Sequence, residues 1–285
     1  QWYRNAASRA LAFALVLGAA FALELTRHLT SLQLQAWGWR VPFLAGVGIA
    51  PVAIFFRQRL EAHATVLACE SSVAGGAVPA APQSPLTATL TDHRKSIVLG
   101  TLLVIGSTVC ASIVTFYMPT YAIGVLRLSP SIAMEAALTS GVIVVVMSPM
   151  AGLLSDEFGR KHVIALSRLA LAALLYPCFS WLSSSPSEFS LLSSVALLSV
   201  FAAMSTAPSI TTVSELFPSS VRATGMSIVY SIGVAVFGGF AQASAVWLIH
   251  VTGNQMAPAY YTIACVFLST LALTLMKDRT GESLP

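Results

Sequence analysis

Long apolar runs separated by polar loops dominate the sequence. A helix that crosses a bilayer needs about 20 mostly apolar residues, and eight segments come close to this length or exceed it. They are Ala6–Leu25, Val41–Phe56, Ile97–Tyr121, Met134–Leu154, Val163–Leu182, Leu191–Val213, Met226–Ile249 and Tyr260–Met276. Apolar and polar residues do not alternate with a period of two, so a β-barrel is not indicated. The pattern predicts an all-α integral membrane protein.

The composition agrees with a lipid environment. Of the 285 residues, 56% are hydrophobic and 9% are charged, whereas soluble domains carry about 25% charged residues. Basic residues occur singly or in pairs between apolar runs, which argues against nucleic acid binding. The four cysteines show neither metal-binding nor disulfide spacing. We expect no metal and no cofactor.

The start of the chain does not resemble a signal peptide. Its first apolar stretch is too long, and no cleavage-like site follows it. The chain begins at Gln1 rather than at Met. We therefore expect that an upstream part of the protein is missing.

A polar segment divides the chain. Residues 61–92 are rich in Ser, Gly, Pro and Ala, a composition typical of flexible linkers. We expect two spans in residues 1–60, a cytoplasmic linker at 61–95, and six spans in residues 96–285.

The positive charges predict the orientation, because cytoplasmic loops are enriched in Lys and Arg. Of the 15 Lys and Arg residues, 12 fall on one side of the eight spans. These are Arg4, Arg9, Arg57, Arg59, Arg94, Lys95, Arg160, Lys161, Arg168, Arg222, Lys277 and Arg279. Arg27, Arg40 and Arg127 fall on the other side. Both termini are therefore expected to be cytoplasmic.

A charged loop with two glycines follows the fourth span. It reads Gly152-Leu-Leu-Ser-Asp-Glu-Phe-Gly-Arg-Lys161. Gly152 would allow close helix approach, and Gly159 would permit a tight turn between two helices. Asp156 is an anion near the membrane surface, while Arg160 and Lys161 would keep the loop in the cytoplasm.

A second motif follows the sixth span: Glu215-Leu-Phe-Pro-Ser-Ser-Val-Arg-Ala-Thr-Gly225, with Pro218 at its fourth position. We expect Asp156, Glu215 and Arg222 to form an ion-pair or hydrogen-bond relay on the cytoplasmic face. Such a relay would hold one conformation closed and release in another. The alternative is a set of isolated surface charges, which would contribute little energy.

Both motifs resemble signatures of the major facilitator superfamily, G-x-L-x-D-x-x-G-R-K/R and E-x-x-P-x-x-x-R-x-x-G. The resemblance implies a major facilitator helical bundle in which the eight spans are equivalent to helices 5–12, with helices 1–4 absent. Two further segments resemble those of one subfamily, the metabolite–proton symporters: Trp37-Gly-Trp-Arg-Val-Pro-Phe43 and Arg57-Gln-Arg-Leu-Glu61. Within that subfamily the chain is most similar to citrate and tricarballylate symporters. Ser205-Thr-Ala-Pro208 departs from their more polar segment, which leaves the substrate open.

Ionisable residues in spans usually mark function, and here the span centres contain almost none. We therefore expect the proton-coupling groups in the absent helices. Arg9 can either extend to the surface or face a cavity. The other candidates for a substrate pathway are neutral: Thr115, Tyr117, Thr120, Tyr121, Tyr230 and Gln242. Their alternative role is to hydrogen-bond within and between packed helices.

The resemblance implies a proton symporter for a small organic acid, working by alternating access in a bacterial inner membrane. Its partners would be a carboxylate, a proton and the lipid bilayer, and we expect a monomer. Other substrate classes remain open (betaine or proline, shikimate, a sugar or a drug), as does a non-transporting fragment. An intramembrane enzyme is disfavoured, because the spans carry neither an acidic pair nor a nucleophile with a base at helical spacing.

Overall fold

The computed structural model describes residues 85–218 and 221–276, with scattered positions between 20 and 44. Contacts divide the chain into two units, residues 24–84 and the remainder. In the first unit a short helix, η1 (Gly38–Arg40), ends at Arg40, whose Nη1 donates to the Ala36 carbonyl at 2.8 Å. The expected spans Ala6–Leu25 and Val41–Phe56, and most of the linker, lie outside the described residues.

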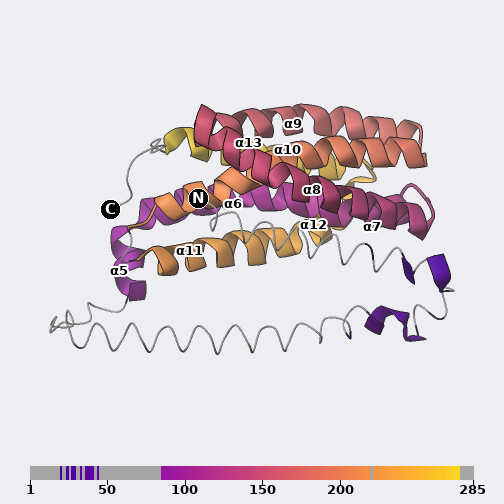
Figure 1. Cartoon of the computed structure of the whole chain (residues 1–285), viewed down its shortest axis with the longest axis horizontal. Coiled ribbons are helices and arrows are strands. Elements are labelled where there is room, and N and C mark those ends of the chain that lie inside the picture. The colour runs from indigo at the N-terminus through magenta and orange to yellow at the C-terminus, as the bar shows by residue number, and fades with distance from the viewer. Residues whose placement is uncertain are drawn as a thin grey trace. The chain divides into compact units, whose positions relative to one another are not determined.

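Among its described residues, the second unit contains six helices long and apolar enough to cross a membrane (Figure 1). The first begins after α5 (Pro85–Asp92) and runs through α6 (Arg94–Ala111), η2 (Ser112–Tyr117) and α7 (Met118–Gly124). Next come α8 (Pro130–Phe158), α9 (Arg160–Ser184) and α10 (Glu188–Glu215). The fifth comprises α11 (Arg222–Tyr230), η3 (Ser231–Gly238) and α12 (Gly239–Thr252), and the last is α13 (Ala257–Leu275). The six expected spans in this part of the chain and the all-helical fold class are confirmed.

Local sequence signals set several helix ends. Ser129 caps α8 by accepting from the Ile132 amide, and Pro130 follows it at the first helical position, where proline is favoured. Ser187 and Ser190 form a reciprocal capping box at the start of α10. The turn between α8 and α9 is the single residue Gly159, whose φ of +85° suits glycine and few other residues. The expected tight turn at this position is confirmed.

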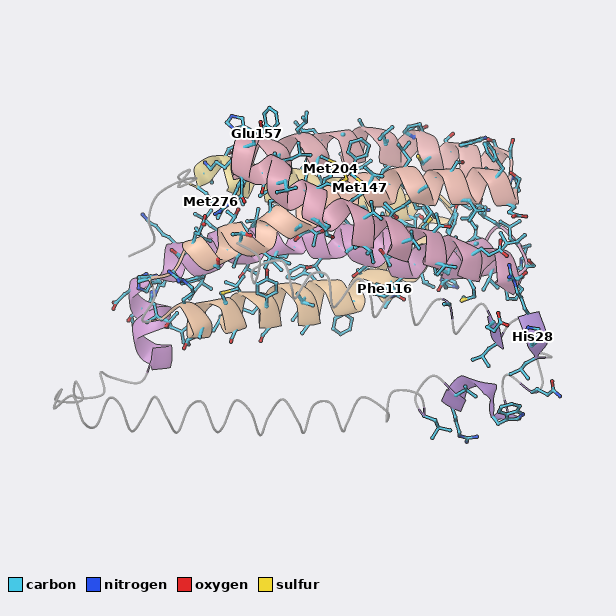
Figure 2. The ribbon with its side chains drawn as sticks, viewed as in Figure 1. His28, Phe116, Met147, Glu157, Met204 and Met276 are labelled. Atoms are coloured by element: carbon cyan, nitrogen blue, oxygen red, sulfur yellow. The ribbon has the colours of Figure 1, made fainter. Side chains whose placement is uncertain are left out.

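Within the bundle, α6 and α10 are the central elements against which the other helices pack. α10 lies against α6, α8 and α9, while α13 lies against α6 and α9. Large apolar side chains also cover the outside of the bundle, and Leu153, Leu166 and Phe189 are 71–73% exposed. Figure 2 shows side chains projecting from the bundle along its length. Because soluble monomers rarely expose so much apolar surface, the outer faces are suited to lipid.

The first and fifth spanning helices each contain a π-helical segment, and these two segments touch. Ser112 Oγ in η2 donates to the Gly238 carbonyl at the end of η3, at 3.3 Å. Gly233 in η3 lies against Val104, so a Cβ there would come within 2.6 Å of Val104 Cγ1. π-helical turns interrupt the regular hydrogen-bond ladder and are frequent at functional sites. Both helices that bear the neutral pathway candidates are thus interrupted where they meet.

Candidate functional site

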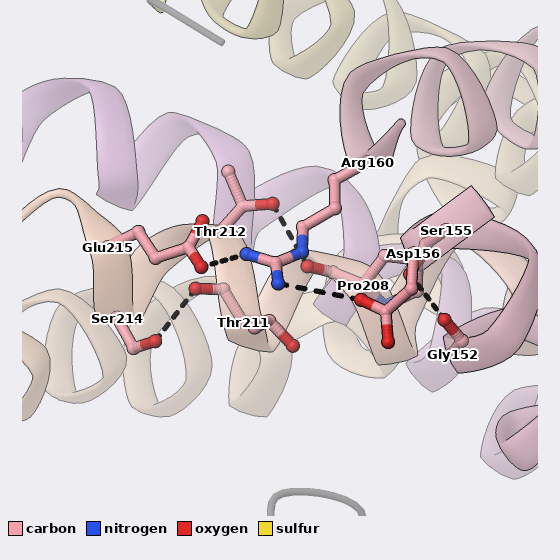
Figure 3. Close-up of polar contacts among 9 residues, drawn as sticks. All are labelled: Gly152, Ser155, Asp156, Arg160, Pro208, Thr211, Thr212, Ser214 and Glu215. Atoms are coloured by element: carbon pink, nitrogen blue, oxygen red, sulfur yellow. Dashed lines mark hydrogen bonds and ion pairs between the residues drawn. The ribbon is translucent and has the colours of Figure 1, made fainter. Parts of the chain in front are cut away.

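Three charged side chains meet where α8, α9 and α10 end or begin (Figure 3). Arg160, the first residue of α9, pairs through Nη1 with Glu215, the last residue of α10. Its Nη2 lies 3.5 Å from Asp156 Oδ1, four residues earlier on α8. The Arg160 and Glu215 side chains are 10% and 11% exposed, whereas Asp156 is 42% exposed. We call these three residues the ion-pair cluster.

The basic residue of the ion-pair cluster is Arg160, whereas the expected relay contained Arg222. Arg222 Nε donates to the Phe217 carbonyl at 3.2 Å, and its Nη2 has no hydrogen-bond partner among the described residues. Arg160 takes the place between the two carboxylates because it begins α9 directly beside the end of α10. Arg222 instead closes the turn that follows Phe217. The expected relay of Asp156, Glu215 and Arg222 is therefore corrected: Arg160, not Arg222, pairs with the two carboxylates.

Neighbouring motif residues tie the same end of the bundle together. Lys161 Nζ donates to the carbonyl of Met276, just past the end of α13. Figure 2 shows Met276 and Glu157, which is next to Asp156, at this end of the bundle. Ser155 Oγ donates to the Gly152 carbonyl at 2.9 Å, and the Pro218 carbonyl accepts from the Val221 amide at 3.2 Å. Four helix ends are therefore joined through the two motifs.

Gly225 lets the start of α11 pack against the buried Phe217 ring. A Cβ at Gly225 would lie 2.6 Å from Phe217 Cε1, whereas a Cβ at Gly239 in the same spanning helix would meet nothing within 4 Å. We expect Gly225→Ala to lower the free energy of unfolding by about 1–3 kcal/mol through overpacking. Gly239→Ala, the matched control, should be neutral or stabilising by up to about 1 kcal/mol. Chemical unfolding in detergent measures both, and equal effects would contradict the packing argument.

A cavity of about 510 Å³, wide open to the surface of the bundle, lies between η2, α7 and α12. Its lining residues are Tyr117, Thr120, Gln242, Ala243, Val246, Trp247 and His250. The structure thus brings three expected pathway residues together: Tyr117, Thr120 and Gln242. It adds Trp247 and His250, which were not among the expected pathway residues. They follow Ala243, which also lines the cavity, by four and seven residues, a helical spacing that could have indicated a shared face.

The remaining pathway candidates lie elsewhere. Thr115 is buried and its Oγ1 lies 3.2 Å from Ser140 Oγ, which also accepts from Ser199 at 2.9 Å. Tyr121 is 1% exposed in the main core, and Tyr230 packs against the second apolar cluster. Thr115 and Tyr121 therefore connect packed helices, which was the alternative role. Arg9 lies outside the described residues.

Arg168 is the polar residue that the sequence reasoning placed wrongly. Counted among the cytoplasmic loop charges, it is in fact 1% exposed within α9. Eight residues separate it from the start of the helix, which corresponds to a depth of about 12 Å. The expectation that the span centres contain almost no ionisable group did not take this buried arginine into account. Ser205 and Ser209, spaced by four on α10, are a signal that could have suggested a buried polar partner.

Comparison with known proteins identifies the family. Residues 70–284 match the family described as "Sugar (and other) transporter". The chain belongs to this family. Sugar (and other) transporters are major facilitator proteins, so the expected superfamily is confirmed, and its members are transporters rather than enzymes.

Individual family members show the same relationship. The chain is 30% identical over 271 residues to the citrate–proton symporter of Klebsiella pneumoniae, covering 95% of this chain and 59% of that protein. It is 26% identical to the glycine betaine/proline/ectoine/pipecolic acid transporter of Dickeya dadantii, covering 94% and 54%. A crystal structure of a D-xylose–proton symporter superposes with a TM-score of 0.70 at 20% identity, covering 97% and 63%. The chain thus spans less than two thirds of each relative's length, and it is a multi-pass membrane protein of this family.

Proposed function

We propose that the full-length protein is a secondary transporter that carries a small organic acid, such as a citrate-like carboxylate, together with a proton. The observation that carries this proposal is the 30% identity to a citrate–proton symporter over 95% of the chain. In an alternating-access cycle, the cavity of Tyr117, Thr120 and Gln242 would form part of the substrate pathway. The ion-pair cluster would close the opposite end of the bundle and release when that end opens.

The proposed orientation places the ion-pair cluster at the cytoplasmic face of the inner membrane. It rests on the unequal distribution of Lys and Arg, which persists when the buried Arg168 is left out. A cysteine at exposed Phe158, beside the α8–α9 turn, should react with a membrane-impermeant maleimide only after the cells are opened. Reaction in intact cells would reverse the orientation.

A second substrate class is favoured by one feature of the cavity. The described residues that line it include the rings of Trp247 and Tyr117 and no Lys or Arg. Aromatic faces attract quaternary ammonium groups, and one relative is named for glycine betaine transport. A betaine-like zwitterion is therefore the alternative substrate.

The deciding experiment measures uptake of labelled citrate and labelled glycine betaine by cells that express the full coding region. We expect citrate uptake that a protonophore abolishes. Protonophore-sensitive betaine uptake without citrate uptake would replace the carboxylate with the zwitterion. Absence of uptake for both substrates, with the protein shown to be in the membrane, would reject both proposals.

Gln242 provides a test of the cavity itself. We expect Gln242→Ala to raise the KM for the transported substrate about tenfold, because losing a hydrogen bond to a charged ligand costs about 1.5 kcal/mol. Ser227→Ala is the control, since exposed Ser227 lies in the same spanning helix and bonds only to the Ala223 carbonyl among the contacts described. Initial uptake rates at several substrate concentrations give the KM and the maximal uptake rate of each variant. An unchanged KM in Gln242→Ala would remove this residue from the substrate pathway.

A further inference from the structure

Arg168 is surrounded by neutral hydrogen-bond acceptors. Its Nε donates to Ser205 Oγ at 3.0 Å, and its Nη1 donates to Ser269 Oγ at 2.5 Å. Its Nη2 donates to the Leu103 carbonyl at 2.9 Å and to Ser209 Oγ at 3.2 Å. No carboxylate pairs with it in the part of the chain that the structure describes. One guanidinium thus joins α9 to α6, α10 and α13.

The surroundings of the guanidinium are built for close packing. Ser269 Oγ donates to the same Leu103 carbonyl at 3.0 Å, so one backbone oxygen of α6 accepts from two side chains of other helices. Gly106, on the next turn of α6, lies against Ser269, and a Cβ there would also come within 3.5 Å of Arg168 Cζ. Only a glycine leaves room for this approach. We call Arg168, its three serine partners and the Leu103 carbonyl the Arg168 clamp.

The energetic cost of such a group indicates a function. A charged side chain buried among membrane-spanning helices is unfavourable by several kcal/mol, and the residues found there usually serve transport. Hydroxyl and carbonyl dipoles offset part of this cost, but an apolar side chain would need no compensation. The geometry explains what Arg168 adds, because its planar five-donor head can reach three helices at once.

The position of the clamp along the first spanning helix decides which part of that helix it holds. Leu103 lies in α6, whereas Tyr117 and Thr120 of the cavity lie beyond Ser112, in η2 and α7. The π-helical segment η2 therefore begins after the clamped part, and the cavity-lining part starts at its last residue, Tyr117. Pro119, which lacks a backbone donor, loosens the helix further just after it.

We propose that Arg168 is a positioning residue for transport. It fixes α6 to α9, α10 and α13 at Leu103, so that movement of this spanning helix is confined to η2 and α7, where Tyr117 and Thr120 meet the cavity. The inference rests on the proposed transport function for its role in turnover. The clamp itself can be tested without substrate.

The structural test uses spin-label distances in the full-length protein. One pair, at exposed Val98 on α6 and Leu166 on α9, reports the clamped part of the helix. A second pair, at exposed Thr120 on α7 and Ser180 on α9, reports the part beyond η2. We expect a single narrow distance for Val98–Leu166 in the wild type, and a broad distribution in Arg168→Met and Arg168→Lys. Arg94→Met, which removes an exposed arginine from α6, should leave it narrow.

The variant Arg168→Lys separates charge from shape, because it keeps the charge but cannot reach all four acceptors. If Arg168→Met does not fold, Arg168→Lys and Ser269→Ala provide the same comparison. An unchanged Val98–Leu166 distribution in Arg168→Lys and Ser269→Ala would overturn the clamp.

The functional readout separates positioning from substrate binding. We expect the maximal uptake rate to fall about tenfold in Arg168→Lys while the KM stays within twofold of the wild type. A tenfold higher KM at an unchanged maximal rate would make Arg168 a substrate-binding residue and overturn the proposal. If the wild type transports neither citrate nor betaine, the proposed function fails, and the distance distributions alone still decide whether the clamp exists.

Discussion

Replacing Glu215 by Gln is expected to lower the free energy of unfolding by about 3 kcal/mol. The side chains of Glu215 and Arg160 are 11% and 10% exposed, so the variant leaves a largely buried guanidinium without its main counter-charge. Breaking a buried pair by removing one partner costs about 3–5 kcal/mol, because the other charge stays desolvated. The low end of this range applies here, since Asp156 remains 3.5 Å from Arg160. Chemical unfolding in detergent micelles measures the loss.

Asp156→Asn is the matched control for this variant. Asp156 pairs with the same arginine, but its side chain is 42% exposed, so water screens the interaction. Exposed ion pairs contribute about 0–1 kcal/mol, and we expect a loss within that range. Equal losses in the two variants would show that burial does not determine the strength of the cluster. A loss under 1 kcal/mol in Glu215→Gln would contradict the assignment of Glu215 as the main partner.

The sequence predicted the six described spans because a membrane helix is defined by its length and apolar content alone. Five of the six predicted spans lie within the corresponding helix, and Tyr260–Met276 ends one residue beyond α13. The capping residues Ser129 and Ser187 extend two of the helices beyond the apolar runs. The sequence also predicted the turn at Gly159, since a one-residue connection requires a residue that tolerates positive φ. These features depend on residues close together in the chain.

What the sequence could not predict depends on how the helices face one another. Low amphipathicity is typical of spans, because both the lipid and the core are apolar, so periodicity does not show which side of α9 is buried. Arg168 was therefore counted with the loop charges, although it lies about two turns inside α9. Its partners on α6, α10 and α13 are 37–101 residues away in the sequence. The choice of Arg160 over Arg222 as the partner of Glu215 likewise follows from the tertiary placement of α9.

Tyr121 gives the second large expected effect. It was a candidate for the substrate pathway, but its ring lies in the main core. The centroid of the ring is 5.3 Å from that of Phe179 and 6.0 Å from that of Tyr117. Tyr121→Ala would leave a cavity between α7 and α9, and removal of a buried aromatic ring costs about 3–5 kcal/mol. We therefore expect a loss of this size in chemical unfolding.

The conservative variant Tyr121→Phe tests whether the residue acts in packing or on substrate. The Tyr121 hydroxyl lies 3.2 Å from Ser183 Oγ and 3.4 Å from the Gln255 carbonyl, so it joins α7 to the ends of α9 and the loop before α13. Losing these bonds should cost about 1 kcal/mol and leave the KM for the transported substrate within twofold. A tenfold rise of the KM in Tyr121→Phe would show that the Tyr121 hydroxyl contacts the substrate. That result would require α7 to turn during transport, because its present contacts direct the hydroxyl to Ser183 and Gln255.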